Sequence, residues 1–306
     1  MRKIKLGLTG METPAVAVGC MRIGGLGRAE AAKFVRAALD LGLNFFDHAD
    51  IYGAGACEEV FADALKDAGA ARGDALIQSK CGIVPGKMFD FSKEHIIASA
   101  EASLRRLKTD YMDVFLLHRP DALVEPEEVA EAFDALHGAG KVRHFGVSNH
   151  KPSQIQLLRK HVRQPIAANQ LQFGVAHAQM VTQGLRANML WDGSEDRDGG
   201  VLDYCRLNDI TIQTWSPLQH GYFEGAFLGD ARFPELNAAI DEVAASHGVA
   251  NTTIAFAWIL RHPAKMQPVT GTKDVARLAD CAKAADVTLT REEWYKIYLA
   301  AGNELP

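Results

Sequence analysis

The chain has 306 residues, a formal net charge of −5 at pH 7, and no concentrated stretch of basic residues. Hydrophobic residues make up 48% and charged residues 23%, a globular composition that excludes a disordered or fibrous protein. Without a basic stripe, neither a nucleic acid nor an anionic membrane is expected as a partner. Small molecules are the expected ligands.

Cysteine usage and the N-terminal sequence indicate the compartment. The five cysteines form no C-x-x-C pair and are scattered, at Cys20, Cys57, Cys81, Cys205 and Cys281. This is typical of reduced thiols rather than of a disulfide framework. No apolar run reaches about 18 residues, and Gly7 and Gly10 interrupt the opening segment before it could act as a signal peptide. We expect a soluble, cytoplasmic protein.

Short apolar runs alternate with amphipathic helical patterns from residue 15 nearly to the end. The expected strands, in chain order, are 15–19, 44–48, 75–80, 114–118, 144–148, 166–172, 211–216 and 266–270. Among the helix signals, Ser92 fits an N-cap, Pro126 fits a first turn, and Gly42, Gly69 and Gly140 fit C-terminal left-handed positions.

The strand patterns show little polar alternation, which favours a parallel sheet covered on both faces. Eight βα units without a linker predict a single (β/α)8 TIM barrel domain over residues 1–306. Segment 2–18 adds an N-terminal β-hairpin with a turn near Thr9 and Gly10, and segment 290–301 adds a C-terminal extra helix. A Rossmann fold is disfavoured, because Glu30 stands where its glycine fingerprint needs a third small residue.

Three expected strands end in reactive side chains, at Asp47, Lys80 and His118. Active sites of such barrels form at the C-terminal strand ends, and strands about 4.8 Å apart bring these groups within about 10 Å. Tyr52 lies in the loop over the same rim. Each residue alone has a structural interpretation, as an ion pair, a core histidine or a packed ring. Jointly, four complementary titratable groups are costly to bury without a function.

The four side chains suggest proton donation to a carbonyl oxygen. A lysine ammonium favours a phenolate, so Lys80 is expected to lower the pKa of Tyr52, while Asp47 holds Lys80 protonated. His118 can hydrogen-bond and polarise a carbonyl oxygen. Such a site is useful where a hydride arrives at the carbonyl carbon.

The segment GLNFFDHADIYG resembles a signature of the aldo-keto reductases, (β/α)8 barrels that reduce aldehydes and ketones with a nicotinamide cofactor. Further likenesses follow in order: SKCG at 79–82, DVFLLHRPD at 113–121, GKVRHFGVSN at 140–149, NQLQ at 169–172 and WSPL at 215–218. The resemblance implies that Asp47, Tyr52, Lys80 and His118 form the catalytic tetrad, with Tyr52 as the general acid. His48, where many members have threonine, is interpreted as structural, and Asp50 as a loop-capping residue.

The same resemblance implies a set of residues that bind the nicotinamide and pyrophosphate parts of the cofactor. They are Ser148, Asn149 and Gln170 on the carboxamide, Trp215 stacked on the ring, and Ser216 and Leu218 at the start of the pyrophosphate loop. Residues 219–223 are bulkier than the glycine-rich stretch often found there, so the contacts of 219–233 stay open.

The adenosine end is expected after the last strand. Lys273 and Arg277 fall in the first turn of the last barrel helix, where the helix N-terminus and two cations favour a 2′-phosphate, hence NADP(H) over NAD(H). Two residues depart from the family pattern: Asp274 replaces a common serine or threonine, and Cys281 a frequent asparagine. An ordinary solvated face remains the structural alternative for the two cations.

The leading hypothesis is an NADP-dependent aldo-keto reductase, a carbonyl reductase or alcohol dehydrogenase that needs no metal. A regulatory, redox-sensing protein resembling potassium-channel beta subunits is the alternative, disfavoured because those usually carry an extension before the barrel. A metal-dependent hydrolase ranks lowest, since the eleven histidines include no H-x-H or H-x-x-x-H spacing.

Substrate choice is expected to depend on loop residues of aromatic and apolar character. The candidates are Met21, Ile23, Phe89, Phe91, Met189, Trp191, Tyr222 and Phe223. No cation is obviously dedicated to a substrate carboxylate, which argues against keto acids. The oligomeric state stays open, with a monomer as the default.

Overall fold

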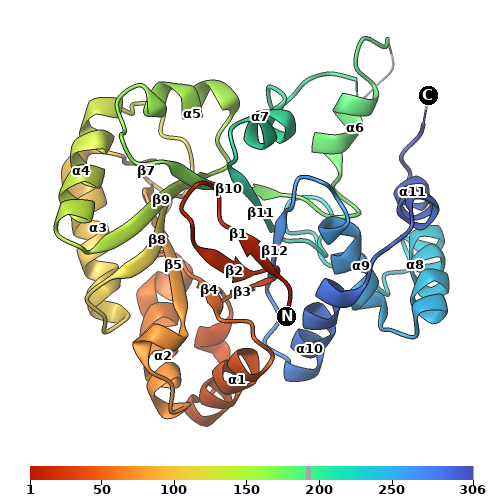
Figure 1. The fold of residues 1–306 in the computed structure, drawn as a ribbon, viewed down its shortest axis with the longest axis horizontal. Helices are drawn as coiled ribbons and strands as arrows, with labels where there is room; N and C mark the ends of the chain where they lie inside the picture. Colours follow the sequence, from red (N-terminus) through yellow and green to blue (C-terminus); the bar gives the residue numbers. More distant parts are fainter. Residues whose placement is uncertain (191–193, 306) are drawn as a thin grey trace.

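The computed structural model describes residues 1–190 and 194–305. Its centre is a closed barrel of eight strands in the order β3–β4–β5–β8–β9–β10–β11–β12, and every neighbouring pair is parallel (Figure 1). The strands are β3 (Ala17–Gly19), β4 (Phe45–Asp47), β5 (Leu76–Cys81), β8 (Met112–Leu117), β9 (Val142–Ser148), β10 (Ile166–Gln172), β11 (Thr211–Trp215) and β12 (Gln267–Thr270). The predicted (β/α)8 barrel is confirmed.

Helices surround the barrel and bury their apolar faces against it (Figure 1). They are α1 (Arg28–Asp40), α2 (Ala56–Asp67), α3 (Lys93–Arg106), α4 (Pro126–Gly138), α5 (Pro152–Arg159), α6 (Gln179–Leu185), α7 (Val201–Leu207), α8 (Pro234–His247), α9 (Asn251–Leu260) and α10 (Val275–Lys283). The expected signals are confirmed: Ser92 caps α3 by accepting from the backbone N–H of His95, and Pro126 opens α4. Gly42, Gly69 and Gly140 adopt φ values of 74°, 69° and 70°.

The predicted N-terminal hairpin consists of β1 (Lys3–Lys5) and β2 (Glu12–Pro14) and lies across the centre of the barrel in Figure 1. Leu6 in its turn is fully buried among residues of the barrel interior. Gly7 has φ +49°, and a Cβ there would lie 2.5 Å from the carbonyl oxygen of Ala167, so only glycine fits. Because the hairpin closes the N-terminal end, a ligand must enter at the opposite end.

The predicted C-terminal extra helix is α11 (Arg291–Ala300), which packs on α8 and touches α9 through Trp294. Trp294 stacks on Trp258 with ring centroids 4.6 Å apart, and each indole N–H donates to the other residue's backbone oxygen at 3.0 Å. The sequence did not predict a small hairpin, β6 (Ile83–Val84) and β7 (Met88–Phe89), because strands of two residues leave no periodicity.

In the described part of the chain, no single helix has the length and apolarity to cross a membrane. The pair α8 and α9 meets those criteria only jointly, with a bend of 92° between them.

Candidate active site

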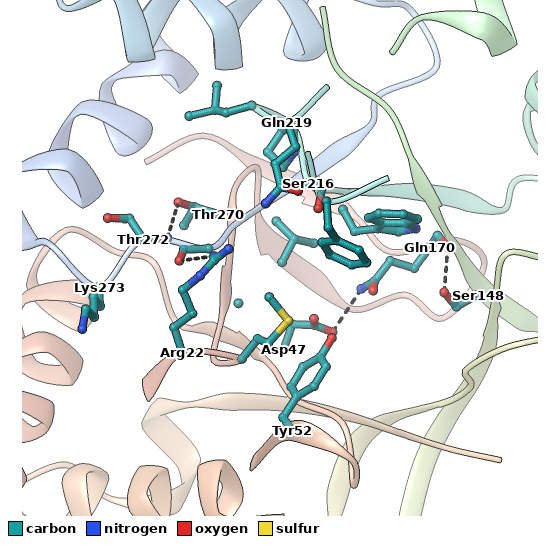
Figure 2. A pocket seen from close by; sticks show the side chains of 18 of the residues that line it. Arg22, Asp47, Tyr52, Ser148, Gln170, Ser216, Gln219, Thr270, Thr272 and Lys273 are labelled. Atoms are coloured by element: carbon teal, nitrogen blue, oxygen red, sulfur yellow. Dashed lines mark hydrogen bonds between the residues drawn. The ribbon is translucent and has the colours of Figure 1, made fainter. Parts of the chain in front are cut away.

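A pocket of about 760 Å³ opens at the C-terminal ends of the strands. Asp47, Tyr52 and His118 line it, and Lys80 lies fully buried in contact with Asp47 and Tyr52. Figure 2 shows Tyr52 and Asp47 near the middle of this pocket, with Lys273 on one side and Ser148 on the other. The structure therefore brings together the four residues of the predicted tetrad.

Lys80 connects Asp47 to Tyr52. Its Nζ donates to Asp47 Oδ2 at 2.8 Å, to the backbone oxygen of His48 at 2.7 Å and to the Tyr52 hydroxyl at 3.3 Å. Burial alone would lower the pKa of Lys80, but Asp47 and Tyr52 raise it above the ordinary value. The side chain is accordingly an ammonium ion held beside the phenol oxygen.

The position of Tyr52 follows from the backbone after β4. Gly53, Ala54 and Gly55 all have positive φ, at 57°, 53° and 94°, and this tight turn leads directly into α2. Burial raises the pKa of Tyr52 above 10, and the charge of Lys80 opposes that rise without cancelling it. The expected net lowering is therefore wrong, because removing the phenolate from water outweighs one ammonium. Tyr52 is a protonated phenol.

His118 lies directly after β8, with its ring centroid 6.1 Å from that of Tyr52. Burial, together with the charges of Lys80 and Arg119, holds the pKa of His118 well below its usual range. Its Nδ1 is buried and has no hydrogen-bond partner within the described residues. A neutral imidazole can hydrogen-bond a substrate oxygen, but it carries no extra proton to give.

A column of buried glutamines supports the Asp47 carboxylate from inside the barrel. Asp47 Oδ1 accepts from Gln78 at 2.5 Å and from Gln170 at 3.0 Å. Both amides also donate to Gln213 Oε1, at 2.9 and 3.2 Å. Gln213 in turn donates to Gln267 at 2.9 Å, and Gln267 donates to Thr13 and to the backbone oxygen of Pro14, both in β2 of the N-terminal hairpin. Apart from Gln170, the residues of this column were not predicted from the sequence, where glutamines inside four otherwise apolar strands are the signal that indicates them.

The residues predicted to bind the nicotinamide form one connected wall of the pocket. Ser148 Oγ donates to the Gln170 backbone oxygen at 2.8 Å, and Asn149 Nδ2 donates to Ser148 Oγ at 2.8 Å. Trp215 Nε1 donates to Asn149 Oδ1 at 3.0 Å. Asn149 has φ +61°, a conformation that asparagine tolerates and that turns the chain at the end of β9. These bonds hold the amide and the indole as one unit.

The predicted phosphate end lies across the pocket. Ser216, Leu218, Lys273 and Arg277 all line it, and the two cations are exposed. Asp274, however, is the N-cap of α10 and accepts from the backbone N–H of Arg277 at 2.8 Å. The expected place of Lys273 in the first turn of this helix is therefore wrong, because Lys273 precedes the N-cap. The helix N-terminus therefore already holds a carboxylate, and the cationic side chains remain as the favourable groups for a phosphate.

Arg22 also belongs to this end, although it was not predicted from the sequence. It lines the pocket, and its Nη1 donates to the backbone oxygen of Gly271 at 2.8 Å (Figure 2). The bond joins the loop after β3 to the loop after β12. The positively charged guanidinium of Arg22 suits a polyanionic ligand. Cys281 also lines the pocket, as the sequence suggested.

The loop after β11 covers part of the mouth. Phe227 N donates to the Leu218 backbone oxygen and His220 N to that of Gly225, both at 3.0 Å, so residues 218–227 form a tight hairpin. Phe223 stacks on Trp215 with centroids 5.8 Å apart. From the open segment 219–233, the pocket residues are Gln219, Tyr222, Phe223 and Ala226.

The substrate candidates divide into two groups. Met21, Tyr222 and Phe223 line the pocket. Four do not: Ile23 and Phe91 are buried in the core, Phe89 is exposed on β7, and Met189 is not among the lining residues. Trp191 lies outside the described residues. Lining residues that the sequence analysis missed include Ile51, Ile83 and Arg119.

Comparison with known proteins gives one consistent result. The model of the family described as "Aldo/keto reductase family" matches residues 15–299. A 6-dehydroglucose reductase of Novosphingobium aromaticivorans is 35% identical over 311 residues, covering 99% of this chain and 96% of that protein. The solved structure of a thermostable aldo-keto reductase, Tm1743, with the inhibitor epalrestat is 27% identical, with a TM-score of 0.79 and coverage of 98% and 100%. An aldo-keto reductase from Klebsiella pneumoniae solved with NADPH shares the fold at 24% identity, with a TM-score of 0.78 and coverage of 99% and 97%.

Proposed function

This chain belongs to the aldo/keto reductase family, and from that premise we propose that it is an NADP(H)-dependent oxidoreductase that reduces aldehyde or ketone carbonyls to alcohols. In this proposal, residues 1–306 form one catalytic barrel domain. The observation that carries it is the placement of a protonated Tyr52 at the pocket, 3.3 Å from the buried ammonium of Lys80.

In the proposed reaction Tyr52 gives its proton to the carbonyl oxygen. The phenolate left behind is stabilised by Lys80, whose charge acts strongly because the site is buried. Asp47 keeps Lys80 charged and in place, and neutral His118 hydrogen-bonds the substrate oxygen. NADPH, when bound, supplies the hydride that the carbonyl carbon accepts.

The pocket fits a nicotinamide dinucleotide. Ser148, Asn149 and Gln170 offer amide and hydroxyl groups to a carboxamide, and Trp215 offers a ring face. Gly19 also lines the pocket. A side chain is not tolerated there, because a Cβ would lie 2.8 Å from the backbone oxygen of Thr270, so the backbone itself forms this part of the wall. At the far end, three positively charged side chains line the pocket: Arg22, Lys273 and Arg277. This charge supports NADP(H) over NAD(H).

The test combines binding with turnover. Purified protein is titrated with NADPH and with NADH while its tryptophan fluorescence is followed, and a panel of aromatic and aliphatic aldehydes is then assayed at the NADPH absorbance. Tighter binding of NADPH and turnover of at least one aldehyde are expected. Tight binding without turnover of any carbonyl compound would instead favour a regulatory nicotinamide sensor.

A further inference from the structure

Arg119 is a pocket residue to which the proposed reaction assigns no role. It immediately follows His118 in the loop after β8, lines the pocket and is half-buried. Its guanidinium carbon lies 5.7 Å from the centroid of the Trp215 ring, a cation–π distance. The cation therefore sits beside the reacting end of the pocket rather than on an outer surface.

No protein carboxylate neutralises Arg119 within the part of the chain that the structure describes. It takes part in no hydrogen bond or salt bridge there. Asp121, two residues on, is committed to the backbone N–H groups of Phe91 and Leu123, at 2.9 and 2.8 Å. By contrast, the partly covered Arg72 and Arg106 each pair with a buried carboxylate at 2.7 Å.

A half-buried guanidinium that no protein group pairs is available to bind an anionic ligand. The cofactor phosphates are expected elsewhere. In the closed barrel β8 and β12 are four strands apart in either direction, so Arg119 lies across the mouth from Lys273 and Arg277. The second ligand, the substrate, is therefore the ligand whose negative charge Arg119 is placed to bind.

We propose that Arg119 binds a carboxylate of the substrate, so that this enzyme prefers aldehydes or ketones that also carry a carboxylate. The planar guanidinium suits a bidentate bond to that group, and the cation–π contact with Trp215 orients it. Met21, Ile83 and Phe223 offer apolar surface to the part of the substrate between carbonyl and carboxylate. This inference rests on the proposed function and revises the sequence-based expectation against keto acids.

The test compares 4-formylbenzoate with its methyl ester, which differ by one charge. With NADPH at pH 7, the wild-type protein should show a higher kcat/KM for the acid. In Arg119→Met the acid-to-ester ratio of kcat/KM should fall at least about tenfold, mainly through the KM of the acid, since a charge-assisted bond is lost. Arg119→Lys, which keeps the charge but not the fork, should recover part of the ratio.

Arg163→Met is the matched control, because 85% of the Arg163 side chain is exposed, and its ratio should equal that of the wild type. The Kd of NADPH is measured for every variant. If Arg119→Met slows acid and ester by the same factor, Arg119 acts only by packing on Trp215, and the proposal is overturned.

Failure of the proposed function gives a different result, namely no turnover of either aldehyde by the wild type. Binding of terephthalate to the NADP complex, followed by tryptophan fluorescence, then still tests Arg119. Saturable binding that weakens at least about tenfold in Arg119→Met supports the carboxylate site. Equal binding to both proteins overturns it.

Discussion

Tyr52 experiences two opposing effects, since burial raises its pKa while the Lys80 ammonium favours the phenolate. Its hydroxyl is the proton donor that the proposed reaction requires. Tyr52→Phe removes that donor and little binding surface, so kcat should fall roughly 10²- to 10⁴-fold. The Kd of NADPH should stay within about twofold. Steady-state kinetics and fluorescence titration of one preparation check both values, and a kcat near that of the wild type would falsify the assigned role.

Asp274 is the residue whose charge conflicts with the proposed cofactor. It caps α10 next to the two cations of the phosphate end, where its carboxylate would repel a 2′-phosphate. Asp274→Ser keeps an N-cap oxygen and removes the charge, so NADPH should bind several-fold more tightly relative to NADH. Lys273→Ala is the opposing control and should weaken NADPH. Equal shifts for both cofactors in either variant would place the 2′-phosphate elsewhere.

Among the structural elements, the barrel strands carry the glutamine column as well as the apolar core. Gln213 on β11 accepts from Gln78 and Gln170 and donates to Gln267. Gln213→Leu removes one hydrogen-bond partner from each of these three buried amides, so the free energy of unfolding should fall by about 2–5 kcal/mol. The reorganised Asp47 support should also lower kcat. Urea denaturation at pH 7 gives the first quantity.

Thr214→Val is the matched control for Gln213, because it lies next in the same strand and its buried hydroxyl has no partner among the described residues. Removing an unpaired hydroxyl costs little or nothing. If Gln213→Leu destabilises the protein no more than Thr214→Val does, the column contributes nothing to stability.

Elements whose residues repeat with a clear period were predictable from the sequence. The eight strands and the helices between them follow from that pattern, and so does the rim that collects Asp47, Lys80 and His118. The β6–β7 hairpin is too short for a pattern. Ile23, Phe89, Phe91 and Met189 were wrongly expected to line the pocket, and they lie in loops or short elements. There the direction of a side chain depends on local turns, and the two-residue period of strands and the 3.6-residue period of helices do not apply.

Contacts between distant elements were the other limit. The glutamine column depends on the register of β5, β10, β11 and β12, and no single strand reveals which side chains meet inside the barrel. Likewise, the sequence shows Arg119 only as a charged loop residue. The fold places it near Trp215, with no salt bridge to a carboxylate in the described part of the chain.

For the whole molecule, the proposals place two separate positive regions around one pocket of a protein with net charge −5. One contains Arg22, Lys273 and Arg277 and suits the cofactor phosphates. The other is Arg119 and suits the substrate. The rest of the protein carries a net negative charge, which repels anionic ligands. A pocket with cations at both ends therefore attracts these ligands specifically to the site.

The stability of the whole protein should depend on pH through its buried histidines. Burial lowers the pKa of His48 to about 3 and of His150 and His262 to about 4. In the unfolded chain these groups titrate near 6.5, so the unfolded state binds more protons, and stability is lost as pH falls from about 6.5 toward 4. Asp50 has the opposite effect on stability, since burial raises its pKa to about 7 and the folded state then binds the extra proton. The three histidines together outweigh this single group.

The urea midpoint should therefore be clearly lower at pH 4.5 than at pH 7, and His48 offers the sharpest test of the cause. Both of its ring nitrogens are buried without partners among the described residues, and its ring packs on Phe61 with centroids 4.5 Å apart. His48→Thr removes a group that must bind a proton on unfolding, so its midpoint should fall less between the two pH values. An unchanged fall would show that other groups, and not the histidines buried in the neutral form, set the acid limit of this barrel.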